Sequence, residues 1–465
     1  MKILLTIFIA LLSLSISKAQ YVEDAIRMLG SNGQITQRAG ALGVSSYGIS
    51  DDASALYYIP AGIFLQKDNE LNFGMNLTNG KIITNYNSTE TTNSANSQAI
   101  SNISLIIPGR NTHTDGLTIG FSYFYDKNLN STSGFNSFIP NGSYLNHLYQ
   151  QQSNRAWIEK VIDFTGGMPY NDSLYQTATV SGSGGIHNIN AAIGFEVDKN
   201  FLAGISLVGR IGNFEYTRKL SEVDVLGKYN VAGSMDMSKF TENNTFNQDY
   251  SGFAVSVSGM YLINDYARVT AKIESPTFYE VKETFTRTAE AEFKPNSQGV
   301  VFKNKETTLD GEQTYNLSTP FIFSAGASMK IVGVTLTTGV EYIDAAQTNY
   351  SSTENSGDFA DLNTQISNEL RGLVKWGVGF EYPLPITSLI VRGSYEKQTS
   401  AYKEVLNRSQ SIGLGLGYLI GKKIRVDAMM KISEFNDRFV TYGSNFYSYQ
   451  TTPTVYGLGI TYRFE

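Results

Sequence analysis

The chain of 465 residues contains no cysteine, only two tryptophans and only three histidines. Without cysteine there is no disulfide and no thiolate nucleophile, so an exported protein of this size must be stabilised in another way. The histidines, His113, His147 and His187, stand apart in the sequence. They form no metal-binding pair and no recognisable catalytic triad. We therefore expect no enzyme, no cofactor and no metal site.

The chain also lacks an excess of positive charge and any long apolar run beyond its first residues. Its net charge of −6 argues against nucleic acid as a partner. Residues 1–19 read as a secretory signal, with a charged start, an apolar core and a small-residue cleavage site. We expect the mature chain to begin at Gln20. A membrane anchor is the alternative, but the run is too short to span a bilayer. An exported chain of this kind is either soluble or a β-barrel.

Tyrosine, phenylalanine and glycine are abundant, with 29, 26 and 43 residues. This composition suits many strands with tight turns, in a membrane barrel with aromatic girdles or in a secreted sandwich. Apolar residues also alternate with polar or small ones, as in 71–78, 189–197 and 374–382. Such a period of two predicts strands with one apolar face.

Fourteen such segments can be counted, and their connections differ in length. Very short connections, such as Asp198-Lys199 and Asn264-Asp265, alternate with long polar ones, such as 127–185, 219–249 and 350–367. An even strand number with this asymmetry is typical of outer-membrane barrels. We predict an all-β, antiparallel transmembrane barrel over residues 67–465. Its strands are expected at 70–78, 99–107, 116–126, 186–197, 200–218, 250–263, 266–289, 313–330, 332–349, 368–382, 387–402, 408–420, 423–440 and 452–464.

Residues 20–66 do not follow the strand pattern. The segment is rich in glycine, which permits close backbone approach. Pro60 forces the chain to bend or to stop pairing, and the Asp51-Asp52 pair precedes an apolar run, where a carboxylate can cap a short helix. We prefer this capping role to an acid/base pair. The segment is expected to form a compact hatch inside the barrel, with a flexible leader as the alternative.

The stretch Ser50–Phe64, SDDASALYYIPAGIF, resembles the hatch of the FadL/TodX family of outer-membrane long-chain fatty-acid and hydrocarbon transporters. The chain has Ile59 where the family usually has asparagine. The resemblance extends to Ile189–Arg210, Ala267–Val281 and Leu317–Asp344, which look like the family's inner strands, and to the Ser275-Pro276 and Thr319-Pro320 breaks. The hatch motif comprises Asp51, Asp52, Ala53, Ser54, Pro60, Ala61 and Gly62.

The resemblance implies passive uptake of a hydrophobic ligand, a long-chain fatty acid or hydrocarbon, across the outer membrane of a Gram-negative cell. It implies that Gln20, Tyr21 and Val22 face the ligand, and that the ligand leaves sideways at a kinked third strand. Here that strand is Leu117–Asp126, with Gly120 as the kink position and Ser122 beside it. The aromatic terminal strand ending at Phe464, followed by Glu465, resembles the signal read by barrel-assembly machinery. Outer-membrane lipid is the other expected partner, and the chain is expected to be a monomer.

Several inward charges and one long loop remain open in function. An amphipathic helix predicted at Tyr144–Phe164 either collects ligand over the barrel mouth or packs on the loop's own core. A nonspecific porin, a receptor or adhesin for haem or another amphiphile, and a soluble secreted β protein remain alternatives. The inward charges are predicted to form a solvated or ion-paired lumen, in which one or two could hold a carboxylate; they are Arg210, Arg268, Lys272, Glu274, Arg392, Arg425 and Arg463.

Overall fold

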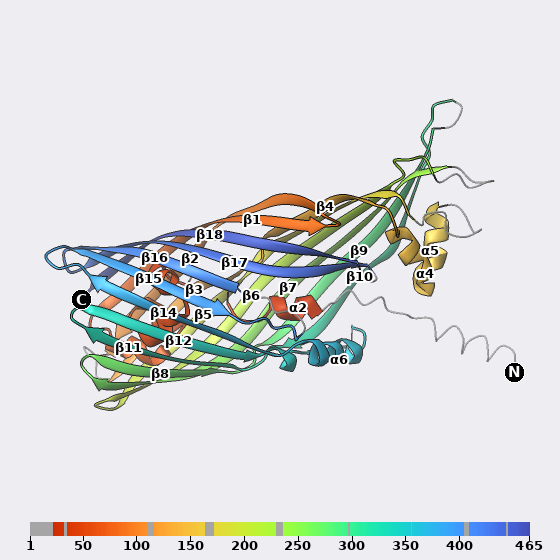
Figure 1. Cartoon of the computed structure of the whole chain (residues 1–465). Coiled ribbons are helices and arrows are strands. Elements are labelled where there is room, and N and C mark those ends of the chain that lie inside the picture. The colour runs from red at the N-terminus through yellow and green to blue at the C-terminus, as the bar shows by residue number, and fades with distance from the viewer. Residues whose placement is uncertain are drawn as a thin grey trace, which may run out of the picture.

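The computed structural model describes residues 22–31, 35–109, 116–162, 172–228, 236–295, 298–354, 356–403, 409–442 and 445–465. Its strands form one closed antiparallel sheet, in which β1 (Asn69–Tyr86) pairs with β18 (Asn445–Phe464) (Figure 1). The strands between them are β2 (Thr89–Pro108), β3 (Leu117–Asn128), β4 (Ser131–Ile139), β5 (Leu174–Asp198), β6 (Phe201–Val223), β7 (Met237–Asn264), β8 (Ala267–Glu274), β9 (Phe278–Phe293), β10 (Lys303–Ser318), β11 (Ile322–Ile331), β12 (Val334–Asp344), β13 (Asn349–Ser351), β14 (Gly372–Pro383), β15 (Leu389–Gln398), β16 (Ser409–Ile420) and β17 (Ile424–Tyr442).

These segments make up fourteen continuous wall strands, because four wall strands are each broken once. The broken pairs are β3 with β4, β8 with β9, β10 with β11, and β12 with β13; β3 and β4 both pair with β5, and β8 and β9 both pair with β7. Pro276 and Pro320 lie in two of the breaks, where a residue without a backbone donor is tolerated. The predicted closed fourteen-strand barrel is confirmed.

An apolar belt covers the outside of the barrel wall. In β1 the exposed large apolar residues are Leu71, Phe73, Met75 and Leu77, and the residues between them are buried. A closed ladder leaves no unpaired strand edge in the hydrocarbon layer, and an outward apolar band is what a bilayer requires. The barrel is therefore that of an outer-membrane protein. No helix among the described residues is long and apolar enough to cross a membrane.

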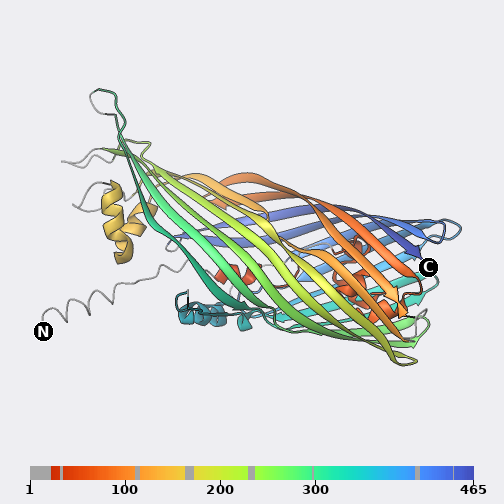
Figure 2. The ribbon, with the colours of Figure 1, turned by 180° about the vertical axis from the view of Figure 1, so that it is seen from behind.

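Several strands extend far beyond this belt at one end of the barrel (Figures 1 and 2). In β6 the outward apolar residues end at Ile211, yet the strand continues to Val223. The prediction of long loops at 127–185 and 219–249 is therefore wrong over much of their length. Outside the belt the outward face of a strand need not be apolar, so the regular alternation that revealed the strands is lost while pairing continues. The opposite end carries the short turns and the carboxyl terminus (Figure 1).

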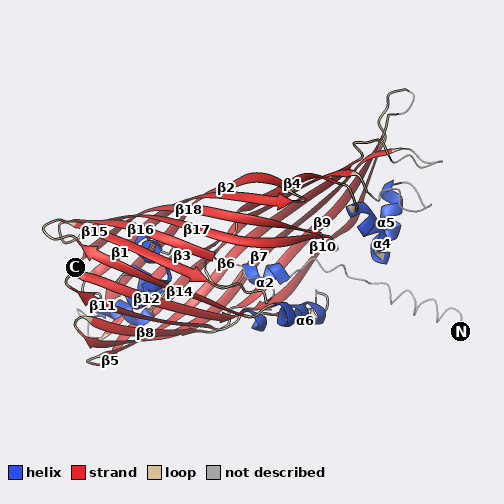
Figure 3. Cartoon of the chain, in the orientation of Figure 1, coloured by secondary structure: helices blue, strands red, loops and turns tan. Residues whose placement is uncertain are grey.

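Short helices from the start of the chain lie inside the strand wall (Figure 3). From residue 22 on, outside the gap at 32–34, two helices and three 3-10 turns precede the first strand: α2 (Val22–Arg27), α3 (Gln37–Leu42), η1 (Gly43–Gly48), η2 (Ala53–Leu56) and η3 (Pro60–Leu65). Every residue of α3 and η1 is buried. The barrel is thus filled near its short-turn end, as expected for a hatch.

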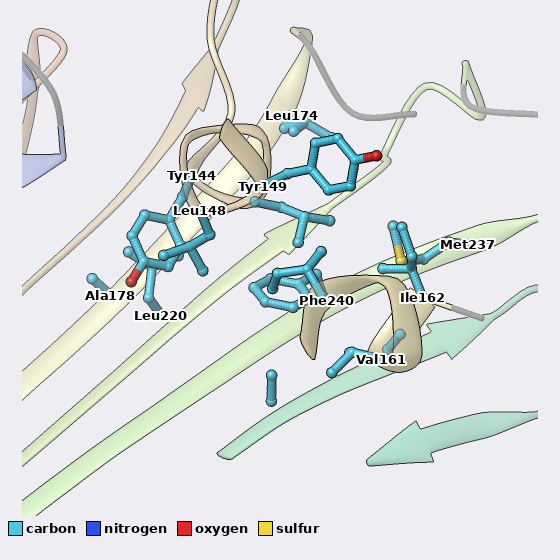
Figure 4. Packing of buried hydrophobic residues seen from close by; sticks show 14 of the residues in the cluster. Tyr144, Leu148, Tyr149, Val161, Ile162, Leu174, Ala178, Leu220, Met237 and Phe240 are labelled. Atoms are coloured by element: carbon cyan, nitrogen blue, oxygen red, sulfur yellow. The ribbon is translucent and has the colours of Figure 1, made fainter. Parts of the chain in front are cut away.

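Three helical segments lie elsewhere: α4 (Tyr144–Gln150), α5 (Gln152–Ile162) and α6 (Ala360–Glu369), with a 3-10 turn η5 (Ala345–Gln347). The predicted helix at Tyr144–Phe164 is a pair of helices, and Phe164 lies outside the described residues. The pair packs on the extended strands rather than on its own loop alone, as Tyr144 and Leu148 do against Ala178 and Leu220 (Figure 4).

Candidate functional site

Polar side chains cap two of the short helical segments of the hatch. Thr36 caps α3, and Asp52 caps η2 by accepting hydrogen bonds from Ser54 N (3.1 Å) and Ser54 Oγ (2.6 Å). Short polar side chains are preferred at this position because they satisfy free backbone donors. The capping predicted for the aspartate pair is confirmed at Asp52, whereas Asp51 turns to the barrel wall.

Buried ion pairs join the hatch to the wall. Arg38 in α3 contacts Asp51 (2.6 Å), Asp52 (3.2 Å) and Glu381 of β14 (2.7 Å). Asp51 also pairs with Arg268 of β8 at 2.6 Å. Since a charge removed from water is tolerated only when it is paired and hydrogen-bonded, these contacts hold the hatch in one position.

The pairing continues along the wall beneath α3. Asp52 binds Arg425 (3.0 Å), which also contacts Asp427 (2.7 Å), and Asp427 pairs with Arg392 at 2.6 Å. At its edge Glu70 pairs with Arg463 (2.9 Å) and accepts a hydrogen bond from Ala53 N (3.0 Å). The ionic network, as we call this set, contains the cations Arg38, Arg268, Arg392, Arg425 and Arg463 and the anions Asp51, Asp52, Glu70, Glu381 and Asp427.

A second charged cluster joins the hatch to β6 and β8. Glu274 pairs with Arg210 (2.5 Å) and with Lys272 (3.1 Å), and Lys272 also donates to Tyr57 O of the hatch at 3.0 Å. Together with the ionic network, this confirms the ion-paired lumen predicted from the inward charges. Alternation along the strands also placed Glu381 and Asp427 on inward faces, but nothing in the sequence indicated Arg38 as their partner.

Glycines of the wall allow the hatch backbone to lie directly against it. A Cβ added at Gly204 would approach Ala61 within 3.0 Å, and one at Gly326 would approach Gly48 equally closely. Pro60 begins η3, and Ala61 N donates to Ser258 Oγ at 2.9 Å. Ile59, in place of the family's asparagine, is fully buried in an apolar cluster that includes Ala61, Phe64, Leu202 and Met260.

The wall is interrupted beside β3. β2 pairs with β3 only from Asn102 to Pro108, whereas its outer part, 89–101, pairs with β1 alone. β4, which continues β3, pairs with β5 on its other side. Among the described residues no ladder of hydrogen bonds therefore joins the outer half of β2 to β4.

The predicted kink position, Gly120, is not the place where the register of β3 changes. Gly120 lies in an unbroken ladder, paired with Ile106 and Ala192, and the register shift of β3 occurs between Tyr125 and Lys127. Gly120 instead leaves room for Leu56 of η2, since a Cβ there would come within 3.0 Å of that side chain. Ser122 points inward and is buried, and its hydroxyl has no hydrogen-bond partner among the described residues.

The bulge in β3 turns two consecutive charged side chains toward the hatch. Asp126 accepts a hydrogen bond from Tyr57 Oη (2.9 Å), and its backbone carbonyl accepts one from Ser31 Oγ (2.8 Å). Lys127 Nζ donates to the carbonyl oxygens of Leu29 (2.8 Å) and Gly30. The bulge therefore holds the segment that links α2 to the rest of the hatch, next to the interruption of the wall.

Aromatic rings line the part of the lumen that surrounds α2. Val22, Ala25 and Met28 are buried there in one cluster with side chains of the wall and of α6. Of the three residues expected to face the ligand, Val22 lies in this cluster, while Gln20 and Tyr21 are outside the described residues. The rings of the wall belong to Phe214, Phe246, Tyr250, Tyr279, Tyr315 and Tyr350.

Comparison with solved structures identifies the architecture. A FadL homologue from Pseudomonas aeruginosa superposes with a TM-score of 0.59, covering 94% of this chain and 100% of its own, at 11% sequence identity. The fold is that of the FadL-type channels. The monoaromatic hydrocarbon channel CymD (TM-score 0.52, 11% identity, 94% and 98% covered) and the toluene transporter TodX of Pseudomonas putida (0.51, 11%, 89% and 94%) share it. No family model and no curated protein matches the sequence.

The FadL-type fold confirms the resemblance inferred from the hatch motif, and these neighbours are channels rather than enzymes. His187 stacks on Tyr123 (ring centroids 5.6 Å apart), His147 lies in α4, and His113 is outside the described residues. The described residues contain no group of three ligating side chains that could hold a metal ion.

Proposed function

We propose that the chain is a plugged outer-membrane channel for passive uptake of hydrophobic small molecules, long-chain fatty acids or hydrocarbons. A hydrophobic solute gains nothing from a water-filled pore, whereas an apolar lumen closed by a movable hatch lets it pass without leaving an open pore. The observation that carries the proposal is the hatch, buried in the barrel and held by the ionic network. A nonspecific porin would need an open lumen at this level.

The fold of the neighbours supports the same function. These neighbours are a FadL homologue, a monoaromatic hydrocarbon channel and a toluene transporter. We propose that the ligand enters at the end with the extended strands and leaves sideways beside β3, where β2 and β4 share no ladder. Export through a cleaved signal at residues 1–19, assembly through the terminal strand ending at Phe464, and a monomeric state complete the proposal.

Deletion of the hatch, or Pro60→Leu, tests this function. Pro60 is the first residue of η3, whose backbone touches Gly194 and Gly204 of the wall. Either change is expected to abolish growth on a long-chain fatty acid or hydrocarbon as sole carbon source, while the amount of heat-modifiable folded barrel stays normal. Unchanged uptake at normal protein levels would reject the proposal.

Purified protein in liposomes gives the complementary result. The unmodified chain is expected to cause no swelling with sugars, whereas a porin would admit them. A titration with haemin is expected to show no specific spectral change. Haemin binding stronger than fatty-acid binding would favour a receptor instead.

A further inference from the structure

The outer part of β10 is a strand edge that belongs to the strands extending beyond the apolar belt (Figures 1 and 2). On one side β9 pairs with the whole of β10, whereas on the other side β13 pairs only with residues 316–318. The side chain of Thr353 donates to Thr314 O just above them. Among the described residues no strand pairs with this second side of β10 from Lys303 to Gln313. We call this stretch, which is about 35 Å long, the free edge.

The free edge lies in water rather than in the bilayer. In the neighbouring β9 the only exposed large apolar residue is Phe278, which lies opposite Ser318, and the free edge begins five residues farther out, at Gln313. A strand edge with unpaired backbone groups is a template for pairing with another strand. Lysines and bulges shield many such edges. β10 has both, but its charges are also sorted along the strand.

A bulge in β10 brings its charges to one face. Lys303 and Lys305 precede the register shift between Thr307 and Leu309, and the carboxylates of residues 310 and 312 follow it. Side chains alternate between the faces of a strand, so without the bulge the lysines and the carboxylates would lie on opposite faces. All four are exposed, and they pair with even-numbered residues of β9, which share one face: Glu292, Glu290, Thr286 and Thr284.

The order of these charges is complementary to itself. A second copy of the free edge, antiparallel to the first about a two-fold axis between residues 307 and 308, places its Glu312 opposite Lys303 and its Asp310 opposite Lys305. By symmetry each pair occurs twice, as in any isologous contact. Opposite charges that face one another across strands stabilise the pairing, and like charges weaken it. A shift by one residue turns the side chains to the other face, so the charges specify one register.

Antiparallel pairing also fixes where the second copy lies. The two-fold axis is perpendicular to the barrel wall and therefore lies in the plane of the membrane. Rotation by 180° about such an axis inverts the barrel, so both copies cannot share one membrane. We propose that the free edge of β10 is a homotypic adhesion site, which pairs with the free edge of a second copy in a facing outer membrane. This site goes beyond the uptake function and does not depend on the solute that the lumen passes.

The test uses the full chain in lipid nanodiscs that hold one barrel each. Pairing of discs is measured by light scattering and by energy transfer between donor-labelled and acceptor-labelled discs, with empty discs as blank. We expect the discs to associate in pairs, and we expect this association to weaken between about 0.01 M and 1 M salt, because exposed charges are screened. Absence of disc pairs at low salt would overturn the proposal, as would association only of barrels within one disc.

Charge reversal separates pairing from damage to the strand. Lys303→Glu with Lys305→Glu, and Asp310→Lys with Glu312→Lys, are each expected to weaken disc pairing by about tenfold or more. A mixture of the two variants should pair again, and so should a chain that carries all four changes. Damage to the contact of Lys303 with Glu292 (3.1 Å) would not be repaired in this way. Lys282→Glu, at an exposed position of β9, is the control. Failure of both rescues would overturn the proposal.

The absence of cysteine allows the register to be tested directly. Lys305→Cys discs mixed with Asp310→Cys discs are expected to form a disulfide under mild oxidation, because residues directly opposite across strands have close Cβ atoms. Lys303→Cys mixed with Asp310→Cys is the control, since these positions are two residues out of register. Equal cross-linking of both mixtures would overturn the proposed pairing.

Discussion

The two parts of the hatch are anchored by different physics. The larger part, from α3 to η3, is tied to the wall by Arg38, Asp51 and Asp52 and by backbone contacts at inward glycines. The smaller part, α2, packs against aromatic rings of the wall, and residues 29–31 after it are hydrogen-bonded to the bulge of β3. Ion pairs in a buried setting have narrow geometric requirements, whereas apolar packing tolerates replacement by another apolar body. The larger part is therefore expected to respond more strongly than α2 to the loss of a charge.

Arg38→Met is expected to have the largest effect, because it removes the central cation that holds the larger part of the hatch. The change leaves Asp51, Asp52 and Glu381 short of a cation in a buried setting, at a cost of about 3–5 kcal/mol. We expect the plug to loosen and the barrel to conduct ions. The measurement is single-channel conductance in planar bilayers. Arg27→Met, in α2, is the matched control and should leave conductance low; equal conductance in the two variants would remove the distinction between the two parts.

Gly204→Val tests the glycine contacts of the larger part separately from its charges. A side chain at Gly204 collides with the backbone of Ala61, and overpacking of this kind costs about 1–3 kcal/mol. We expect faster proteolysis within residues 53–65 in the folded barrel. Gly209→Ala is the control, because a Cβ there meets its nearest neighbour at 3.6 Å. If Gly204→Val leaves the protease resistance of η3 unchanged, the close backbone contact is not a constraint.

Much of this architecture follows from residue patterns, but the anchoring of the hatch does not. Period-two alternation located all fourteen wall strands, because the bilayer and the lumen impose opposite polarity on successive residues. Alternation also placed Glu381 and Arg425 on the inward face. It could not pair them with Arg38 or Asp52, since such pairs join positions more than 340 residues apart. The aromatic cluster around α2 was missed for the same reason, as its rings come from several distant strands.

The sequence also misled in two instructive places. Gly120 looked like a kink because glycine weakens a strand, yet its ladder is intact and its missing side chain makes room for Leu56. The irregularity lies at Asp126, a residue type with no special tendency to form a bulge. The outer ends of β5 to β7 looked like loops because, outside the membrane, neither face of the strand must be apolar.

The helix pair α4–α5 is also held by a buried carboxylate, and this adds a pH-dependent case to the comparison. Glu242, at the outer end of β7, accepts from Tyr144 Oη of α4 (2.6 Å) and pairs with Arg218 (2.8 Å) and Arg287. Burial opposes its ionisation, but the two arginines outweigh burial and hold the pKa of Glu242 below its usual 4.5. A carboxyl group with a depressed folded-state pKa stabilises the fold above its unfolded pKa, and this stability is lost as the pH falls through the folded value.

We therefore expect hydrogen exchange in residues 144–162 to accelerate as the pH falls below about 4.5, after correction for the intrinsic exchange rate. Glu242→Gln should weaken the packing of α4 at neutral pH by about 1–2 kcal/mol, because a charge-assisted hydrogen bond is lost, and should flatten the pH dependence. The hatch serves as the internal reference. If acidification loosens the hatch as much as α4–α5, Glu242 is not the group responsible.

Lys127→Met, the mildest change, acts on the link between the two parts of the hatch. The ammonium group donates to the carbonyls of Leu29 and Gly30, and methionine keeps the length of the side chain while removing both bonds. Part of the loss is offset because a buried charge is removed as well, so the net cost is about 1 kcal/mol. We expect hydrogen exchange in residues 22–31 to accelerate by about fivefold, with no rise in ion conductance. A rise in conductance without faster exchange in residues 22–31 would show that Lys127 secures the larger part of the hatch instead.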